Sequence, residues 1–505
     1  MITKGYLEGE PLRIGGEAQL LLDDALVEDR MFLRRVLYKT VKYEHNPILT
    51  RTRPWEGDSV QAPLVVWDPE RERYRMWYTC TNQSNYFGGG LVYYLAHAES
   101  EDGFHWEKPL MDQFPVGPHR RTNVVYTGAH ADPKSNKRIF APGLVFHDTE
   151  EKDPQKRFKM IGLDGRPNPK HGGEVNTEPN LICSPDGLHW TLQGNKSILD
   201  HHSDCANLVV YDPAAKRWLL YCRPPMYSSG LDEWSTRRHH RRRVAVMVSY
   251  DFVHWSYPRT VLYADEDARD LPDIDHITVF RRGSHFIMLY AAMDGGGRAR
   301  WNAKLASSTD GVHWERFHTR ENFIPSGADG AWDAGILPCG AAVPSGDKLL
   351  LYYSGVNMGQ HEFLSSQSEC RSGGGVAIMA KDRFVAQRAG DQTGYLLSRE
   401  ILIEGNTLRL NMAAEHIAFC RGCVRVSVCR HPPIGEHADY YFQEKGYTYR
   451  YEGFGFDDCI PLECDNLSAK VSWKEKDLSA LQGKPAYLRF EIRNADLFSF
   501  SITKE

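Results

Sequence analysis

The chain has 505 residues, of which 41% are hydrophobic and 25% are charged, and its formal net charge at pH 7 is −5. This composition is typical of a globular protein, and it lacks the strongly basic balance of a protein that binds nucleic acid. We therefore expect no nucleic-acid partner. No apolar run is long enough to span a bilayer, so we also expect no membrane partner.

The first residues and the cysteines bear on the compartment of the protein. Residues 1–5 contain no hydrophobic signal core, so we expect a cytoplasmic protein, or a secreted or periplasmic one if a leader has been removed. Eleven cysteines are scattered through expected strands, which favours buried free thiols over a disulfide framework. Cys420, Cys423 and Cys429 cluster without a fourth ligand at metal-finger spacing, so we expect no metal and no cofactor.

The N-terminal segment, residues 1–46, contains a short apolar run at 18–22 and a mixed basic run at 32–39. We expect this segment to brace the domain that follows it. One way to do so would be to add a strand to the last sheet of that domain.

Residues 47–394 repeat one pattern five times: a buried run and a turn lead to a strand rich in aromatic residues. In the first copy the buried run is Ala62–Pro69 and the aromatic strand is Tyr74–Tyr78. The copies span residues 58–110, 138–193, 204–258, 273–319 and 333–390.

Four of the copies carry the phrase Ser-x-Asp-x-x-His-Trp, which begins at Ser100, Ser184, Ser249 and Ser308. In three of them Gly follows Asp, and tight hairpins prefer Asp-Gly because it tolerates positive φ. We therefore interpret the phrase as a hairpin tip whose Asp, His and Trp have structural roles. The fifth copy has Asp-Arg-Phe at 382–384 in its place.

Five units of four short antiparallel strands predict an all-β fold with a five-bladed β-propeller at residues 47–394. Such a ring leaves only short, protected strand edges. The remaining residues, 395–505, lack the hairpin phrase and contain alternating short strands at 408–412, 424–428 and 487–492. We expect them to form a compact C-terminal β-sandwich.

In a propeller the innermost strands converge around a central pocket, so polar residues where these strands begin are candidates for chemistry. Acidic residues recur at these positions: Asp58, Asp204, Asp273, Asp275, Asp329 and Asp333. The second copy lacks an acid there, and Glu174 and Glu178 in its loop are the candidates instead. Capping of strands and turns is the structural alternative for each of them.

Several carboxylates in one semi-enclosed pocket cannot all keep ordinary pKa values, because repulsion and desolvation push the pKa of at least one of them upward. That group can act as a general acid while another stays ionised as base or nucleophile, which is the arrangement of glycoside hydrolysis. A separation of about 5 Å between the two carboxyl groups would give retention, and about 6.5–9.5 Å would give inversion.

Sugar hydroxyl groups need charged donors and acceptors, and sugar rings can lie against aromatic faces. Arg166, Arg223 and Asp294 end the second strands of the second, third and fourth copies, where they can point to one rim. The substrate-binding candidates are Arg166, Arg223, Asp275, His276, Asp294, Asp333 and Trp332. Core ion pairs and packing between blades are the structural alternatives.

These features together resemble the superfamily of glycoside hydrolase families 32, 43 and 68, over residues 18–500. The trailing domain is most similar to that of family 32. The resemblance implies that Asp58 is nucleophile or base, Asp204 a stabilising or acid carboxylate, and Glu178 a proton donor. The short signatures of family 32 are absent, and Gly-Asp-Ser stands at 57–59, so we identify the chain as a divergent relative.

Three functions follow as hypotheses. The first is an exo-acting glycoside hydrolase for a terminal, furanose-type sugar, using a carboxylate pair that includes Asp58. The second is a glycoside phosphorylase resembling family 130, in which the basic run 237–243 would hold phosphate. The third is a propeller that binds carbohydrate without catalysis, whose acids would not come within reaction distance of each other.

Overall fold

A computed structural model describes the chain from residue 9 onward, with gaps. The gaps are 83–84, 86–88, 132–135, 137, 149–150, 169–173, 195–196, 200, 202, 204–206, 226–241, 263–272, 294–299, 360–361, 363–368, 418–419 and 434–437. Within described strands, the side chains of residues 139, 166–168, 174–178, 416–417 and 420 also lie outside the description.

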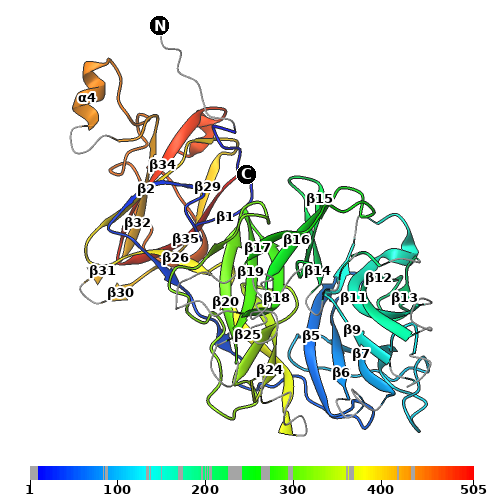
Figure 1. Ribbon diagram of the computed structural model, residues 1–505. Coiled ribbons are helices and arrows are strands. Elements are labelled where there is room, and N and C mark those ends of the chain that lie inside the picture. The colour runs from blue at the N-terminus through cyan, green and yellow to red at the C-terminus, as the bar shows by residue number, and fades with distance from the viewer. Residues whose placement is uncertain are drawn as a thin grey trace, which may run out of the picture. The chain divides into compact units, whose positions relative to one another are not determined.

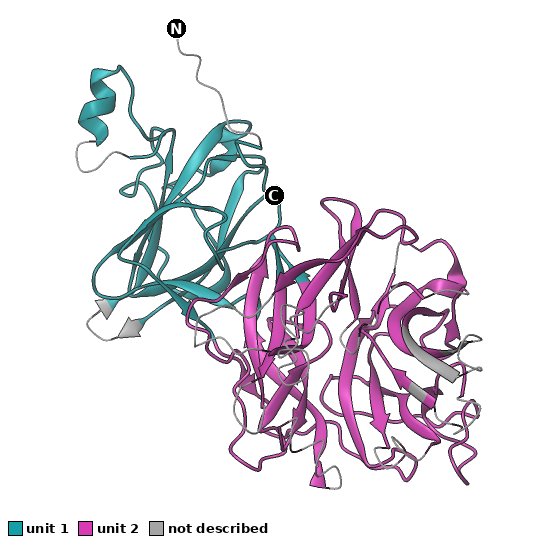
Figure 2. Cartoon of the chain, in the orientation of Figure 1, with its two compact units in different colours: residues 1–38, 281–286, 380–505 teal, residues 39–280, 287–379 magenta. Residues whose placement is uncertain are grey.

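The chain folds into two compact units (Figure 2). Unit 1 comprises residues 1–38, 281–286 and 380–505, and unit 2 comprises residues 39–280 and 287–379. The domain boundaries predicted from the sequence are at 46 and 394. Strands from the N-terminal segment contribute to both units, as described below.

Unit 2 repeats a run of four neighbouring strands, which we number as strand groups one to five (Figure 1). Groups one and two join into one sheet of nine strands, because β9 pairs in parallel with β7. The outer strand of group five is β4, which comes from the N-terminal segment and pairs with β25. Group one contains β5 (Ser59–Asp68), β6 (Arg73–Thr81), β7 (Leu91–Ser100) and β8 (Val124–Tyr126); group two contains β9 (Arg138–Ala141), β10 (Phe146–His147), β11 (Phe158–Asn168), β12 (Glu174–Ser184) and β13 (Thr191–Leu192), with the 3-10 helix η1 (Pro154–Lys156); group three contains β14 (Leu208–Asp212), β15 (Arg217–Cys222), β16 (Val244–Ser249) and β17 (Arg259–Leu262); group four contains β18 (Asp273–Arg282), β19 (His285–Met293), β20 (Trp301–Ser308) and β21 (Glu315–Arg316); and group five contains β22 (Gly335–Pro338), β23 (Val343–Ser345), β24 (Lys348–Val356), β25 (Ser372–Ala380) and β4 (Val41–Lys42).

The hairpin phrase forms the same tip in all four copies. In the second copy, Asp186 Oδ1 accepts hydrogen bonds from the backbone N–H groups of Leu188 and His189 at 2.8 and 2.9 Å. Its Oδ2 lies 2.7 Å from Nδ1 of the same histidine, and Ser184 Oγ accepts from Gly187 N–H at 2.8 Å. The acid therefore holds the turn together, and the structural interpretation of the phrase is confirmed.

Each glycine-containing tip is docked on the strand group before it. Gly187 O of group two accepts a hydrogen bond from Trp77 Nε1 of group one at 2.6 Å. Gly311 O of group four accepts one from the hydroxyl of Tyr221 in group three at 2.7 Å. The tip of group one docks on group five, where the Tyr352 hydroxyl donates to Gly103 O at 3.0 Å. The tip contacts thus connect the first group to the fifth, as the closed ring of a propeller requires. The number of blades stays a prediction.

Removing the donor at this last contact should weaken the fold. We expect Tyr352→Phe to lower the free energy of unfolding by about 1–3 kcal/mol, because the buried carbonyl of Gly103 would lose its partner. Tyr257→Phe is the matched control, since the side chain of Tyr257 is 76% exposed and should change the free energy little. Denaturant unfolding of the two variants measures the difference, and equal effects would contradict a role of this hydrogen bond in stability.

Two antiparallel sheets build the β-sandwich of unit 1. Their inward side chains form one hydrophobic core, to which Leu410 and Phe500 contribute from one sheet and Val426 and Phe490 from the other. The first sheet contains β1 (Gln19–Leu20), β3 (Arg34–Leu37), β26 (Val385–Ala389), β29 (Thr407–Ala414), β33 (Asp465–Lys470) and β35 (Ala495–Thr503); the second contains β2 (Val27–Met31), β27 (Gly394–Ser398), β28 (Ile401–Leu402), β32 (Cys423–Cys429) and β34 (Pro485–Arg493); outside them lie β30 (His416–Ile417), β31 (Cys420–Arg421), the helix α4 (Ala438–Glu444) and the 3-10 helix η4 (Leu478–Leu481).

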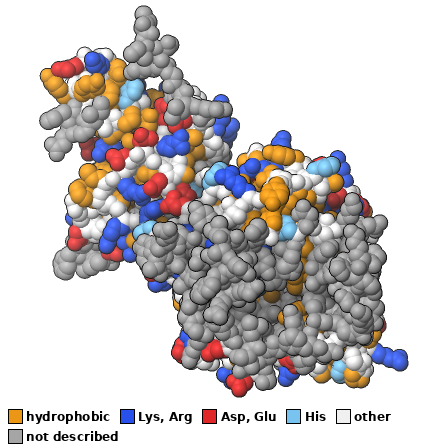
Figure 3. Space-filling model, in the orientation of Figure 1, with side chains coloured by type: hydrophobic (Ala, Val, Ile, Leu, Met, Phe, Trp, Pro, Cys, Tyr) orange, Lys and Arg blue, Asp and Glu red, His pale blue; other side chains and the backbone are white. Residues whose placement is uncertain are grey.

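The all-β prediction is confirmed, and the sandwich strands come from both ends of the chain. The strand β3 pairs with β26, and β1 pairs with β35. The nine cysteines whose side chains are described are free thiols, and six of them are buried. On the face shown in Figure 3, the described Lys and Arg side chains are interspersed with Asp and Glu side chains. None of the helices among the described residues combines the length and apolar character needed to cross a membrane.

Candidate functional site

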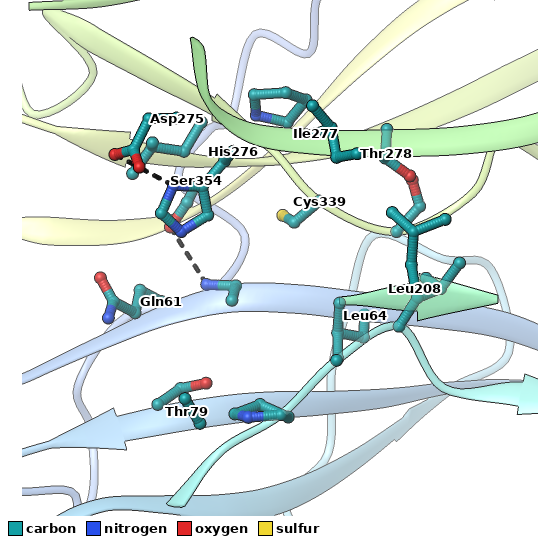
Figure 4. A pocket seen from close by; sticks show the side chains of 18 of the residues that line it. Gln61, Leu64, Thr79, Leu208, Asp275, His276, Ile277, Thr278, Cys339 and Ser354 are labelled. Carbon is teal, nitrogen blue, oxygen red and sulfur yellow. Dashed lines mark hydrogen bonds and ion pairs between the residues drawn. The ribbon is translucent and has the colours of Figure 1, made fainter. Parts of the chain in front are cut away.

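A cavity of about 260 Å³ lies in unit 2 where the first strands of the five groups meet (Figure 4). Group one supplies Gln61 and Leu64, and group four supplies the run 275–278. Residues 141–144, 207–208 and 337–340 complete the ring of first strands. The expectation that the inner strands of all groups converge on one pocket is therefore met.

Four consecutive residues of β18, Asp275 to Thr278, line the cavity. Side chains alternate between the two faces of a strand, so a continuous run of lining residues means that the edge of β18 is turned toward the cavity. Thr278 Oγ1 donates to Gly340 O at 2.7 Å, which fixes this edge against group five. Neighbouring residues on the strand can therefore act on the same ligand.

Asp275 lies between several polar side chains at the cavity. Its Oδ1 accepts a hydrogen bond from Arg223 Nη2 at 2.8 Å and lies 3.5 Å from Arg242 Nε. Its Oδ2 accepts from Trp301 Nε1 at 2.8 Å and lies 3.4 Å from His276 Nδ1. The carboxylate is 7% exposed and brings together side chains from groups three and four.

The charges around Asp275 decide its protonation state. Burial pushes its pKa upward, but the charges of His276, Arg242 and Arg223 outweigh burial and hold the pKa well below its usual range. For Asp273, two residues earlier, burial dominates and the pKa is raised. At neutral pH Asp275 is therefore ionised: it can accept hydrogen bonds and stabilise positive charge, and it has no proton to donate.

Backbone geometry places the two arginines. Arg223 directly follows β15, and its N–H donates to Ser203 Oγ at 2.9 Å. The same serine hydroxyl donates to Oδ1 of Asn207, a lining residue, at 2.6 Å. Arg242 N–H donates to Asp273 Oδ1 at 2.6 Å just before β16 begins. Both arginines are thereby tied to the first strands that surround the cavity.

Of the predicted site residues, Asp275 and His276 line the cavity, and Arg223 contacts Asp275 without lining it. Asp58 is exposed, is not among the lining residues, and donates its N–H to Thr81 O at 2.7 Å. Its catalytic role stays a prediction. The strand β5 begins one residue later, at Ser59, so Asp58 precedes the paired part of the strand.

Two further predicted residues form a different cluster. Asp333 Oδ2 accepts from Lys42 Nζ at 2.5 Å and from the Tyr353 hydroxyl at 3.1 Å. Trp332 stacks on Tyr353, with ring centroids 5.9 Å apart and an interplanar angle of 17°. Neither Asp333 nor Trp332 is among the described residues of the cavity lining, and their contacts are those of a packed loop.

The remaining predicted residues fall on undescribed parts of the chain. Asp204 and Asp294 lie outside the described residues, as do the side chains of Arg166 and Glu178. The backbone of Glu178 pairs with that of Asp164 across β11 and β12. The roles predicted for these four residues stay predictions.

Asn207 and Asp164 were not singled out from the sequence, and Trp301 was expected in a loop, where it could stack on a sugar ring, whereas it begins β20. Nothing in the sequence near Trp301 signals its hydrogen bond to Asp275. Asp164 is an acid in the middle of an apolar strand, and this pattern could have identified it in the sequence as a candidate functional residue. It is fully buried, accepts from the Tyr126 hydroxyl at 2.7 Å and from Ala129 N–H at 3.1 Å, and burial raises its pKa.

No protein-family model matches the sequence, and no curated protein matches it. Among solved structures, a glycosyl hydrolase from Bacteroides ovatus is similar, with 14% identity, a TM-score of 0.46, and coverage of 69% of this chain and 95% of that chain. A β-1,2-mannobiose phosphorylase from Listeria innocua, in complex with β-1,2-mannobiose, has 12% identity, a TM-score of 0.44, and coverage of 68% and 97%. An N-acetylgalactosamine deacetylase from F. plautii, in complex with blood group B trisaccharide, has 17% identity, a TM-score of 0.43, and coverage of 69% and 96%. At this level of similarity none of the three assigns an activity to this chain.

Proposed function

We propose that the protein is a carbohydrate-active enzyme that cleaves a glycosidic bond and binds the sugar in the cavity of unit 2. The observation that supports this most directly is the mixed polar lining. Amide and hydroxyl side chains of Gln61, Asn207 and Ser354 reach the cavity from three strand groups, and each both donates and accepts hydrogen bonds. Sugar hydroxyl groups do the same, so this lining is complementary to a sugar.

The finer proposal is exo-acting hydrolysis of a terminal, furanose-type sugar. The cavity, at about 260 Å³, lies just below the range of about 300–1,000 Å³ that holds drug-sized ligands, which favours one terminal sugar over a longer chain. Its described lining holds one carboxylate, Asp275, which is ionised. The proposed carboxylate pair therefore needs a partner among Asp58, Asp204 and Glu178.

Phosphorolysis is the second candidate, and the position of Arg242 favours it. This residue belongs to the basic run at 237–243, and it lines the cavity beside His276, with Arg223 buried behind Asp275. Arginine is the side chain best suited to hold phosphate, because its planar guanidinium matches the geometry of the phosphate oxygens. A phosphate bound there would lie within the same cavity as the sugar.

A substrate screen tests both candidates. Purified protein is incubated with aryl furanosides, aryl pyranosides and fructans, with and without inorganic phosphate, and the released sugar is measured. Release without phosphate supports hydrolysis, whereas release that requires phosphate supports phosphorolysis. In the second case Arg242→Gln should raise the KM for phosphate, while Arg259→Gln on exposed β17 should not. Absence of any release would contradict the proposal and leave carbohydrate binding without catalysis.

A further inference from the structure

Cleavage of a glycosidic bond by acid–base catalysis needs a group that gives up and takes back a proton near neutral pH. Arginine and tyrosine side chains do not exchange protons in this range. Imidazole is the side chain whose ordinary pKa lies between 5 and 8. The titratable side chains in the described lining of the cavity are Tyr93, Arg242, Asp275, His276, Cys339 and Cys370.

The two thiols and the carboxylate are poorly suited to this task. Burial raises the pKa of Cys370 to about 11 and that of the Cys339 thiol further still. The positive charges around Asp275 overcome the effect of its burial and keep it ionised, so that it has no proton to deliver. Within the described lining, His276 is the residue that remains.

The geometry of His276 matches that of a histidine that transfers protons. Its Nδ1 lies 3.4 Å from Oδ2 of Asp275, and Trp301 Nε1 holds that same oxygen at 2.8 Å. A carboxylate at Nδ1 fixes the orientation of the ring and stabilises the imidazolium. The side chain of His276 is 31% exposed and belongs to the cavity lining, so a bound ligand can reach it (Figure 4).

We infer that His276 is a catalytic proton-transfer residue of this cavity, oriented by Asp275; the inference rests on the proposed function. The proton on Nε2 moves to the glycosidic oxygen as the bond between that oxygen and the anomeric carbon breaks. An oxygen of water, or of phosphate, forms the new bond to the anomeric carbon. The proton that this nucleophile releases returns the imidazole to its charged form, so that protons and electron pairs balance over one turnover.

Charged groups from two strand groups, three and four, surround Asp275 and the imidazole beside it. They are the acids Asp275 and Asp273, both on β18, and the cations Arg223 after β15 and Arg242 before β16. Because these groups interact, the pH dependence of the reaction will report the cluster rather than one residue. A change at His276 alone should nevertheless remove one limb of the pH–rate profile.

A comparison of leaving groups tests the assignment. His276→Gln replaces the imidazole with an amide, which can form hydrogen bonds but cannot deliver a proton. The substrates are two glycosides of the sugar that the wild-type protein releases, one with a 2,4-dinitrophenyl leaving group, which departs unprotonated, and one with an alkyl leaving group. We expect kcat on the alkyl glycoside to fall by about 10²–10⁴-fold, with a much smaller loss on the dinitrophenyl glycoside. His254→Gln is the matched control, because His254 is 87% exposed at a hairpin tip.

A second measurement needs no substrate. NMR of the free protein with ¹³C-labelled histidine gives the titration of each imidazole, and the signal missing from His276→Gln identifies His276. We expect this signal to titrate between pH 5 and 8. An imidazole that keeps one charge state across this range, or equal losses on both glycosides, would overturn the proton-transfer role and leave the proposed function standing. A wild-type protein that cleaves no glycoside would overturn both.

Discussion

Replacing Gly187 with alanine is expected to lower the free energy of unfolding by about 2–6 kcal/mol, because two costs add at this hairpin tip. Gly187 has a φ of +74°, a conformation that costs a residue with a Cβ about 1–3 kcal/mol. A Cβ here would also lie 2.5 Å from Cζ2 of Trp77 and 3.0 Å from Nη2 of Arg75. Both side chains are buried, so relieving this overlap should cost about 1–3 kcal/mol more.

Gly194→Ala separates the two costs. Gly194 has a φ of +61°, and a Cβ added there would meet nothing within 4 Å. This control should therefore show the backbone cost alone. Denaturant unfolding followed by tryptophan fluorescence gives both values. Equal losses in the two variants would mean that the contact between the hairpin tip and Trp77 does not contribute to the stability of unit 2.

The repeated units could be predicted because their signals are local. The Asp-Gly turn and the residues that follow it lie within seven positions, and the hydrogen bonds of Asp186 stay inside that span. The docking of each tip on the preceding group could not be predicted. Trp77 and Gly187 are 110 positions apart, and no local pattern indicates which aromatic residue meets which tip.

The strand pairing in unit 1 could not be predicted from the sequence for the same reason. The N-terminal segment, residues 1–46, was expected to brace the propeller, for example by adding a strand to its last sheet, and its strand β3 pairs with β26 in the sandwich. The pairing joins Leu37 to Val385, which lie far apart in the sequence, so no local pattern indicates that these two strands meet. The short strand β4, a few residues later, pairs with β25 as the outer strand of group five.

The site was predicted in part, for a physical reason. Asp275 and His276 were found because they stand near the start of an inner strand, which is a position that sequence can reveal. Arg223 was found because it follows the end of a second strand. Arg242 and Trp301 both contact the carboxylate of Asp275, and whether they do so depends on the direction of their side chains. The sequence alone does not show that direction. The acid that the sequence analysis ranked first, Asp58, precedes its strand and is exposed.

The second large effect is expected for Arg223→Met, which removes one side of a buried ion pair. The side chains of Arg223 and Asp275 are 3% and 5% exposed, and methionine keeps much of the arginine volume without its charge. Breaking such a pair leaves a buried charge with less compensation, so we expect the free energy of unfolding at pH 7 to fall by about 3–5 kcal/mol. Arg73→Met is the matched control, because Arg73 and Glu101 are 37% and 79% exposed and their pair should contribute less than about 1 kcal/mol.

The pH dependence of this loss follows from the sign of the pKa shift. The pKa of Asp275 in the folded protein lies well below its ordinary value, so its ion pairs stabilise the fold above the unfolded pKa of about 3.9 and lose this effect as the pH falls. The gap between wild type and Arg223→Met should therefore be widest near pH 7 and narrow below about pH 4. Unfolding measured at several pH values tests this, and a gap that stayed constant down to pH 3 would show that Arg223 acts through packing. In that case the charge of Asp275 would be balanced by Arg242, whose Nε lies 3.5 Å from Asp275 Oδ1.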